Sequence, residues 1–117
     1  MYEVEPKSIS SNDFFEWDDF LKYVSPNPFD ECGWFDVTIG EVGVSGGTEF
    51  QVLVSTPKAI KRARSDNRRF KGIVVDEFTP SKVTEVIERA IKDAASMTWG
   101  ETLSKLREFG DWEYDGM

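Results

Sequence analysis

Residues 34–55 read WFDVTIGEVGVSGGTEFQVLVS, and this stretch decides the fold. Large apolar residues stand at every second position on both sides of a glycine-rich centre: Phe35, Val37, Ile39, Phe50, Val52 and Val54. A period of two is typical of strands that bury one face. The glycines of 43–47 supply a turn of more than two residues. The stretch therefore predicts a β-hairpin with strands over Trp34–Val42 and Thr48–Ser55.

Two Thr-Pro pairs beyond the hairpin predict helix starts. In Thr56-Pro57 and Thr79-Pro80 the threonine can accept hydrogen bonds from free N–H groups, and proline is well tolerated at the first helical position. Between the pairs, the apolar run Ile73–Val75 is typical of a central strand. After the second pair, apolar residues recur at helical spacing: Val83, Val86, Ile87, Ala90, Ile91 and Ala94. This stripe predicts a long helix with one face on the core.

The N-terminal part predicts two further elements. Tyr2–Ile9 is expected to be extended. Apolar residues at steps of three and four within Asn12–Tyr23 predict a short helix, which Ser-Pro-Asn-Pro at 25–28 ends.

The C-terminal part completes the order of elements. Thr98 and Glu101 are spaced as a capping box that opens a last helix, and Gly110 ends that helix. Trp112–Tyr114 can form a short final strand. Because several strands are joined directly, we expect an α+β fold: a two-layer sandwich of an antiparallel or mixed β-sheet with helices packed mainly on one face.

Length and composition predict a single cytoplasmic domain. The chain has 117 residues, which is enough for one core, over residues 1–117. It has no apolar run of about 18 residues, and its start, MYEVEPKSIS, does not resemble a signal peptide. Cys32 is the only cysteine, so no disulfide can form within the chain.

The residue types predict no enzyme, no cofactor and no metal. The chain has no histidine, which removes the usual general base and the commonest metal ligand. The carboxylate pairs Asp18-Asp19, Asp30-Glu31 and Asp76-Glu77 are adjacent, so their side chains diverge. The glycines of 43–47 lack the GK[ST] ending of a phosphate loop. A hydrolase would need carboxylates that are distant in sequence.

Charge is distributed unevenly along this acidic chain, whose net charge is −8. Residues 1–33 hold eight acids and two bases, whereas residues 58–71 hold seven bases and one acid. An acidic protein is repelled by nucleic acids and anionic membranes, so we expect a basic partner, no membrane and no direct contact with nucleic acid. The alternative is a nucleic-acid-binding or regulatory accessory domain that uses the basic segment 58–71.

The acidic aromatic segment, Asn12–Trp34, is the main candidate for an interface. It combines six acids with seven rings: Phe14, Phe15, Trp17, Phe20, Tyr23, Phe29 and Trp34. Exposed rings would serve as interface anchors, and the acids would steer a basic partner. The other interpretation is a segment that faces the core and carries an ordinary acidic rim. The sequence leaves both interpretations open.

Residues spread over nearly the whole chain resemble the immunity protein 8 family of bacterial polymorphic toxin and contact-dependent growth inhibition systems. The stretches that carry the resemblance are Lys7–Ser11, Gly43–Phe50, Val52–Pro57, Ile73–Val75 before a long helix, Trp99 before the last helix, and Trp112–Tyr114. The resemblance rests on their order and spacing. It implies a protein that binds the C-terminal domain of a toxin made beside it and blocks that domain without catalysis.

The resemblance also implies roles in folding for the matching residues. Thr56 and Pro57 would start a helix, and Trp99 and Trp112 would lie in the core. Glu113 would accept a hydrogen bond from a buried donor.

For a toxin-binding protein, the acidic aromatic segment supplies the predicted contact surface. Its residues are Asp13, Glu16, Trp17, Asp18, Asp19, Asp30 and Glu31. If the toxin is a nuclease, these carboxylates would occupy its basic cleft in place of phosphates.

Overall fold

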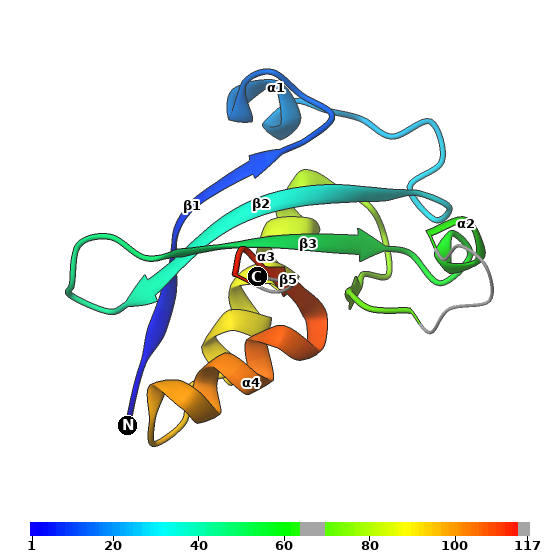
Figure 1. Ribbon diagram of the computed structural model, residues 1–117. Coiled ribbons are helices and arrows are strands. Elements are labelled where there is room, and N and C mark those ends of the chain that lie inside the picture. The colour runs from blue at the N-terminus through cyan, green and yellow to red at the C-terminus, as the bar shows by residue number, and fades with distance from the viewer. Residues whose placement is uncertain (64–69, 115–117) are drawn as a thin grey trace.

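The computed structural model describes residues 1–63 and 70–114 (Figure 1). The elements are β1 (Val4–Ser11), α1 (Trp17–Leu21), β2 (Cys32–Glu41), β3 (Thr48–Ser55), α2 (Ile60–Ala63), β4 (Ile73–Val74), α3 (Pro80–Asp93), α4 (Trp99–Phe109) and β5 (Gly110–Trp112). This order of strands and helices is the one that the sequence predicts.

The strands form one mixed sheet, so the predicted α+β class is confirmed. β1, β2 and β3 pair antiparallel in that order. The other edge of β3 is shared, because β5 pairs antiparallel with its first half and β4 pairs parallel with its end. Figure 1 shows α3 behind the sheet, and no described helix lies in front of β1 and β2.

The predicted hairpin is confirmed, and its register explains the core. Phe35 lies opposite Val52, and Val37 lies opposite Phe50, so these four side chains share one face. All four are buried. Glycines make the turn possible, because Gly43 and Gly46 have φ angles of 82° and 84°, which other residues rarely adopt. The chain approaches itself closely beside the turn, because a Cβ atom on Gly47 would lie 2.5 Å from the carbonyl oxygen of Ile39.

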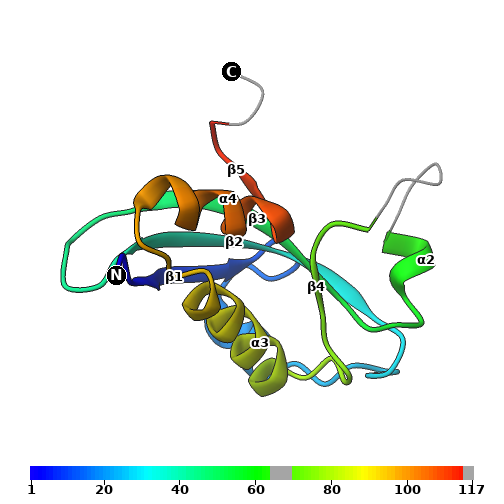
Figure 2. The same cartoon turned by 90° about the horizontal axis from the view of Figure 1, so that it is seen from below.

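The predicted amphipathic helix is α3, and its stripe faces the hairpin. Val83, Ile87 and Ile91 are fully buried in the same core cluster as the hairpin residues. Thr79 begins the helix as predicted, since its hydroxyl oxygen accepts a hydrogen bond from the Lys82 N–H at 3.3 Å. Seen from below, α3 lies on one side of β1 and β2 (Figure 2).

The last helix and strand are also confirmed. Thr98 caps α4, and its hydroxyl oxygen accepts a hydrogen bond from the Glu101 N–H at 3.2 Å. Gly110 ends α4 as its C-cap and begins β5. Trp99 and Trp112 pack against the core while half-buried, so the implied core role holds for one side of each ring.

The helix predicted over Asn12–Tyr23 is too long. The N–H of Asn12 bonds the carbonyl of Trp34 at 3.0 Å, so the chain there still follows β2. Only Trp17–Leu21 is helical. The apolar spacing reflects rings that converge on Phe20 from a bent segment, not one continuous helical face.

The central strand predicted around Ile73–Val75 is wrong in its position. β4 has two residues and lies at the edge of the sheet, where Val74 is 47% exposed. β5 already occupies the neighbouring half of the β3 edge, which leaves room for a short pairing only. Gly72 enters this site so closely that a Cβ atom would lie 2.3 Å from the carbonyl oxygen of Leu53.

The first Thr-Pro pair does not start a helix directly. α2 begins only at Ile60, after a turn in which the Ala59 N–H bonds the Thr56 carbonyl at 3.1 Å. The hydroxyl of Thr56 is occupied elsewhere, because it bonds the backbone of Glu31. The threonine of this Thr-Pro pair therefore bonds Glu31, 25 positions away in the sequence, and does not cap a helix.

Candidate functional site

The acidic aromatic segment is anchored on the core by Phe20. This ring is 1% exposed, and its centroid lies 5.0 Å from that of Trp17 and 5.2 Å from that of Phe35. Phe14 and Tyr23 pack around the same ring, at centroid distances of 5.6 Å and 6.5 Å. The core-facing interpretation is therefore confirmed for these rings of the segment.

Other apolar side chains of the segment remain in solvent. Phe15 is 97% exposed and lies shortly before α1, and Val24 is 85% exposed and lies shortly after it. Phe29 and Trp34 are also exposed. Large apolar groups gathered in one exposed segment are typical of an interaction surface. The interpretation of the segment as an interface stays a prediction for these exposed side chains.

The returning part of the segment is held to the core through its backbone. The Glu31 N–H bonds the hydroxyl oxygen of Thr56 at 3.0 Å, and the Thr56 N–H bonds the Glu31 carbonyl at 3.0 Å. The Thr56 hydroxyl donates to that same carbonyl at 3.2 Å. The Phe78 N–H bonds the carbonyl of Pro28 at 2.6 Å. Because Thr56 and Phe78 are buried, Glu31 is fixed in position before any partner binds.

The carboxylate of Glu31 is only half satisfied. The Tyr23 hydroxyl donates a short hydrogen bond to its Oε1 atom. Its Oε2 atom is buried and has no hydrogen-bond partner among the residues that the structure describes. Burial, and then the hydrogen bond to Glu31, raise the pKa of the Tyr23 phenol from its ordinary value of 10.0.

This raised pKa gives a testable pH dependence. A group whose pKa is raised by folding contributes stability that is fully present at pH values below its pKa in the unfolded chain. This contribution is lost as the pH rises through the pKa of the group in the folded protein. We therefore expect the parent chain to lose more stability than Tyr23→Phe between about pH 9 and pH 11. Thermal denaturation of both proteins across this range measures the difference. Equal losses would show that Tyr23 ionises as it does in the unfolded chain.

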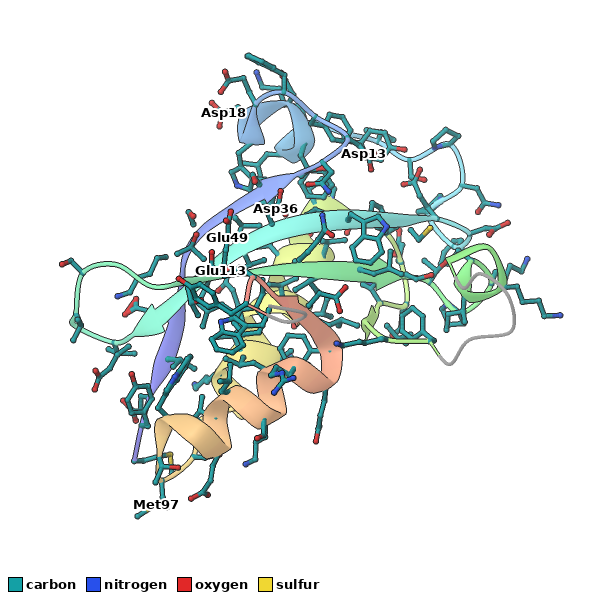
Figure 3. The ribbon with its side chains drawn as sticks, in the orientation of Figure 1. Asp13, Asp18, Asp36, Glu49, Met97 and Glu113 are labelled. Carbon is teal, nitrogen blue, oxygen red and sulfur yellow. The ribbon has the colours of Figure 1, made fainter. Side chains whose placement is uncertain are left out.

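The structure brings only part of the predicted contact set to the surface. Asp13, Glu16, Asp18 and Asp19 are exposed along the approach to α1 and its first turn. Figure 3 shows Asp13 and Asp18 on this part of the chain, above the sheet.

The remaining three predicted residues are half-buried. Trp17 packs against Phe20 with the two rings tilted by 30° and meets Phe35 edge-on, so a part of its ring belongs to the core. Asp30 is half-buried in the turn where its N–H bonds the carbonyl of Asn27 at 3.0 Å. Glu31 is half-buried beside Tyr23.

A second group of carboxylates lies on the open face of the sheet, and the sequence interpretation missed it. Asp36 on β2 lies opposite Gln51 on β3. Glu49 stands two residues before Gln51 on β3, so Asp36 and Glu49 share the face away from the core. Glu113 lies beside them beyond β5 (Figure 3). The alternation of residues 34–55 contains this signal, because its polar positions must share one face.

Glu113 is fixed in place at this open face. Its Oε1 atom accepts hydrogen bonds from the Thr48 hydroxyl at 2.7 Å and from the Glu49 N–H at 3.0 Å. The Glu49 bond first, and then the Thr48 bond, lower the pKa of Glu113 below its ordinary value. The carboxylate does accept bonds, as the resemblance implies, but its donors lie at an exposed edge and are not buried.

The basic segment 58–71 is described only in part. Lys58 and Lys61 are exposed, and Lys71 forms an ion pair with Asp111 at 2.9 Å. The arginines at 64, 68 and 69 lie outside the described residues.

Two features are absent from the described part of the chain. Within residues 1–63 and 70–114, no three His, Cys, Asp or Glu side chains are grouped so that they could hold a metal ion. No helix in the same ranges is long and apolar enough to span a membrane.

Comparison with known proteins identifies the family. No curated protein and no solved structure matches the chain. The sequence profile of the family described as Immunity protein 8 matches residues 5–116, which is nearly the whole chain. This match includes all the strands and helices described above, except for Val4 at the start of β1. The chain therefore belongs to the immunity protein 8 family.

Proposed function

We propose that this protein protects its own cell by binding the C-terminal domain of a toxin encoded beside it. The observation that carries this proposal is the family match over residues 5–116, because the family is one of immunity proteins. Binding covers the toxin's active site physically and involves no reaction by the immunity protein. The setting is a polymorphic toxin or contact-dependent growth inhibition system, in which one domain, residues 1–117, acts in the cytoplasm.

The proposed contact surface is the exposed part of the acidic aromatic segment. Asp13, Glu16, Asp18 and Asp19 flank Phe15 along the chain, and all four acids and the Phe15 ring are exposed. An aromatic anchor inside a ring of charges is a common arrangement at tight interfaces. The carboxylates attract a basic partner and accelerate its association. Trp17, Asp30 and Glu31 contribute their solvent-facing sides.

A nuclease domain is the kind of toxin that this surface fits best. Nucleases bind phosphates in basic clefts, and carboxylates accept hydrogen bonds from the same arginine and lysine side chains. The net charge of −8 favours this pairing over long range. The immunity protein would then exclude the nucleic acid from the cleft.

Co-expression tests this function in cells. The toxin domain encoded by the neighbouring gene is induced with and without this chain. We expect colonies only when the chain is present, because a stoichiometric inhibitor must bind every toxin molecule. A chain truncated after Ser55, which lacks α3 and α4, serves as the control. Equal killing with and without the full chain would overturn the proposal.

A further inference from the structure

A small cavity lies where the acidic aromatic segment meets β2, and its volume is about 190 Å³. Its lining combines apolar rings with polar side chains: Ser11, Asp13, Phe14, Phe20, Tyr23, Glu31, Cys32, Phe35 and Phe78. Asp13 is exposed and Phe20 is buried, so the cavity extends from the surface to the core. Gly33 helps to keep it open, because a Cβ atom there would lie 3.2 Å from Phe78 Cζ and 3.4 Å from Asp13 Oδ2.

The electrostatics of this cavity are incomplete in the free protein. Glu31 contributes the buried Oε2 atom that has no hydrogen-bond partner in the described part of the chain. Leaving a buried charged acceptor unsatisfied costs free energy, typically about 1–3 kcal/mol or more. The bonds to Thr56 hold the Glu31 main chain in place, and the hydrogen bond from the Tyr23 hydroxyl holds its side chain toward the cavity. No described residue donates to Glu31 Oε2, and a donor that enters the cavity would satisfy this atom.

The lining fits one chemical class of ligand. A positive charge would meet the carboxylates of Glu31 and Asp13 and would lie against the faces of aromatic rings, which attract cations. An apolar cavity of about 150 Å³ accommodates benzene, so the volume here is sufficient for the end of a long side chain. The methylene groups of lysine or arginine suit the phenylalanine walls.

We propose that this cavity, the cation socket, receives one lysine or arginine side chain of the toxin domain. The inference rests on the proposed function and adds a specific anchor point to it. In the complex the cation bonds Glu31 Oε2, and Asp13 closes the entrance from the solvent side. The socket slows dissociation of the toxin domain and fixes its orientation, whereas the exposed acids of α1 raise the association rate.

Glu31→Gln tests the socket directly, because it keeps the side-chain shape and removes the charge. We expect the dissociation constant for the neighbouring toxin domain to rise roughly 10- to 100-fold, through faster dissociation. Glu108→Gln removes the same charge from an exposed position on α4 and should change the constant less than about twofold. Surface plasmon resonance measures both rates.

A stability measurement separates this role from a structural one. Removing an unsatisfied buried charge should leave the melting temperature of Glu31→Gln equal to or above that of the parent chain. A residue that only supports the fold would instead lower it. If Glu31→Gln fails to fold, Asp13→Asn at the exposed entrance replaces it, with an expected affinity loss of about threefold to tenfold.

The possible failures are distinguishable. If the toxin domain binds the parent chain, Glu31→Gln and Asp13→Asn with equal affinity, the cavity holds only solvent, the socket is wrong, and the proposed function stands. If the toxin domain does not bind the parent chain, the proposed function is wrong.

The socket is then tested with n-butylammonium as a probe. NMR shifts at the amides of Glu31, Cys32 and Gly33 that vanish in Glu31→Gln support it, and their absence overturns it.

Discussion

We expect Phe20→Ala to lower the free energy of unfolding by about 3–5 kcal/mol, which is the range for large-to-small changes of buried phenylalanine. Phe20 is 1% exposed and meets rings from β2 and from the loop before α3, Phe35 and Phe78. Its removal leaves a cavity that the surrounding rings cannot fill without moving. Urea denaturation measures the loss.

Phe15→Ala is the matched control, because it makes the same change five residues earlier in the chain. Phe15 is 97% exposed, so its truncation should alter stability by less than about 0.5 kcal/mol. The two variants together test how the acidic aromatic segment divides its rings between core and surface. Equal losses for both variants would contradict that division. Phe15→Ala should still weaken binding of the toxin domain, since the ring is the proposed anchor.

The second large effect concerns association with the toxin domain. Replacing both Asp18 and Asp19 with lysine reverses the charge of the first turn of α1. We expect the association rate at low salt to fall roughly 10- to 100-fold, because these exposed charges steer a basic partner. Raising the ionic strength should shrink the difference, since salt screens exposed charges. Stopped-flow mixing at several salt concentrations measures the rates.

Two lysine substitutions on the open face of the sheet form the control for this variant. Asp36→Lys and Glu49→Lys change the net charge by the same amount on the open face of the sheet, where Asp36 is half-buried and Glu49 is exposed. If the toxin domain docks against α1, this control should slow association much less than the α1 variant does. A larger effect of the sheet variant would place the contact on the sheet and contradict the proposed surface.

The elements that sequence reasoning predicted well depend on local pattern. The hairpin was predicted from alternating apolar residues and from glycines. The structure has both features, as the paired strands β2 and β3 and the turn between them. α3 follows from a stripe of helical period behind a Thr-Pro start, and its buried residues are those of the stripe. In these stretches the local preference and the tertiary contacts agree, which makes prediction possible.

The elements that were predicted poorly depend on distant partners. Thr56 has the residue type of a helix cap, but its hydroxyl bonds Glu31, and nothing in the neighbouring sequence indicates that choice. β4 is short because β5, almost 40 residues later, takes half of the available edge. The apolar spacing near α1 comes from rings that gather on Phe20. Such contacts are set by the assembled fold.

The candidate site was also predicted only where local sequence decides the structure. Composition places acids and rings together in the acidic aromatic segment, and four of the seven predicted contact residues are exposed. The sequence did not separate Glu31 from the exposed acids, because its half-buried position depends on Tyr23 and Thr56. It also missed the cavity, whose lining comes from β1, the segment, β2 and the loop before α3.

Titration of the purified toxin domain with this purified chain tests the central claim most directly. Activity of a fixed toxin concentration is measured while the chain is added in increasing amounts. The account predicts a linear fall to zero at one equivalent, since each chain occludes one toxin active site and performs no turnover. Full toxin activity at several equivalents would contradict it, and so would complete inactivation by a small fraction of an equivalent.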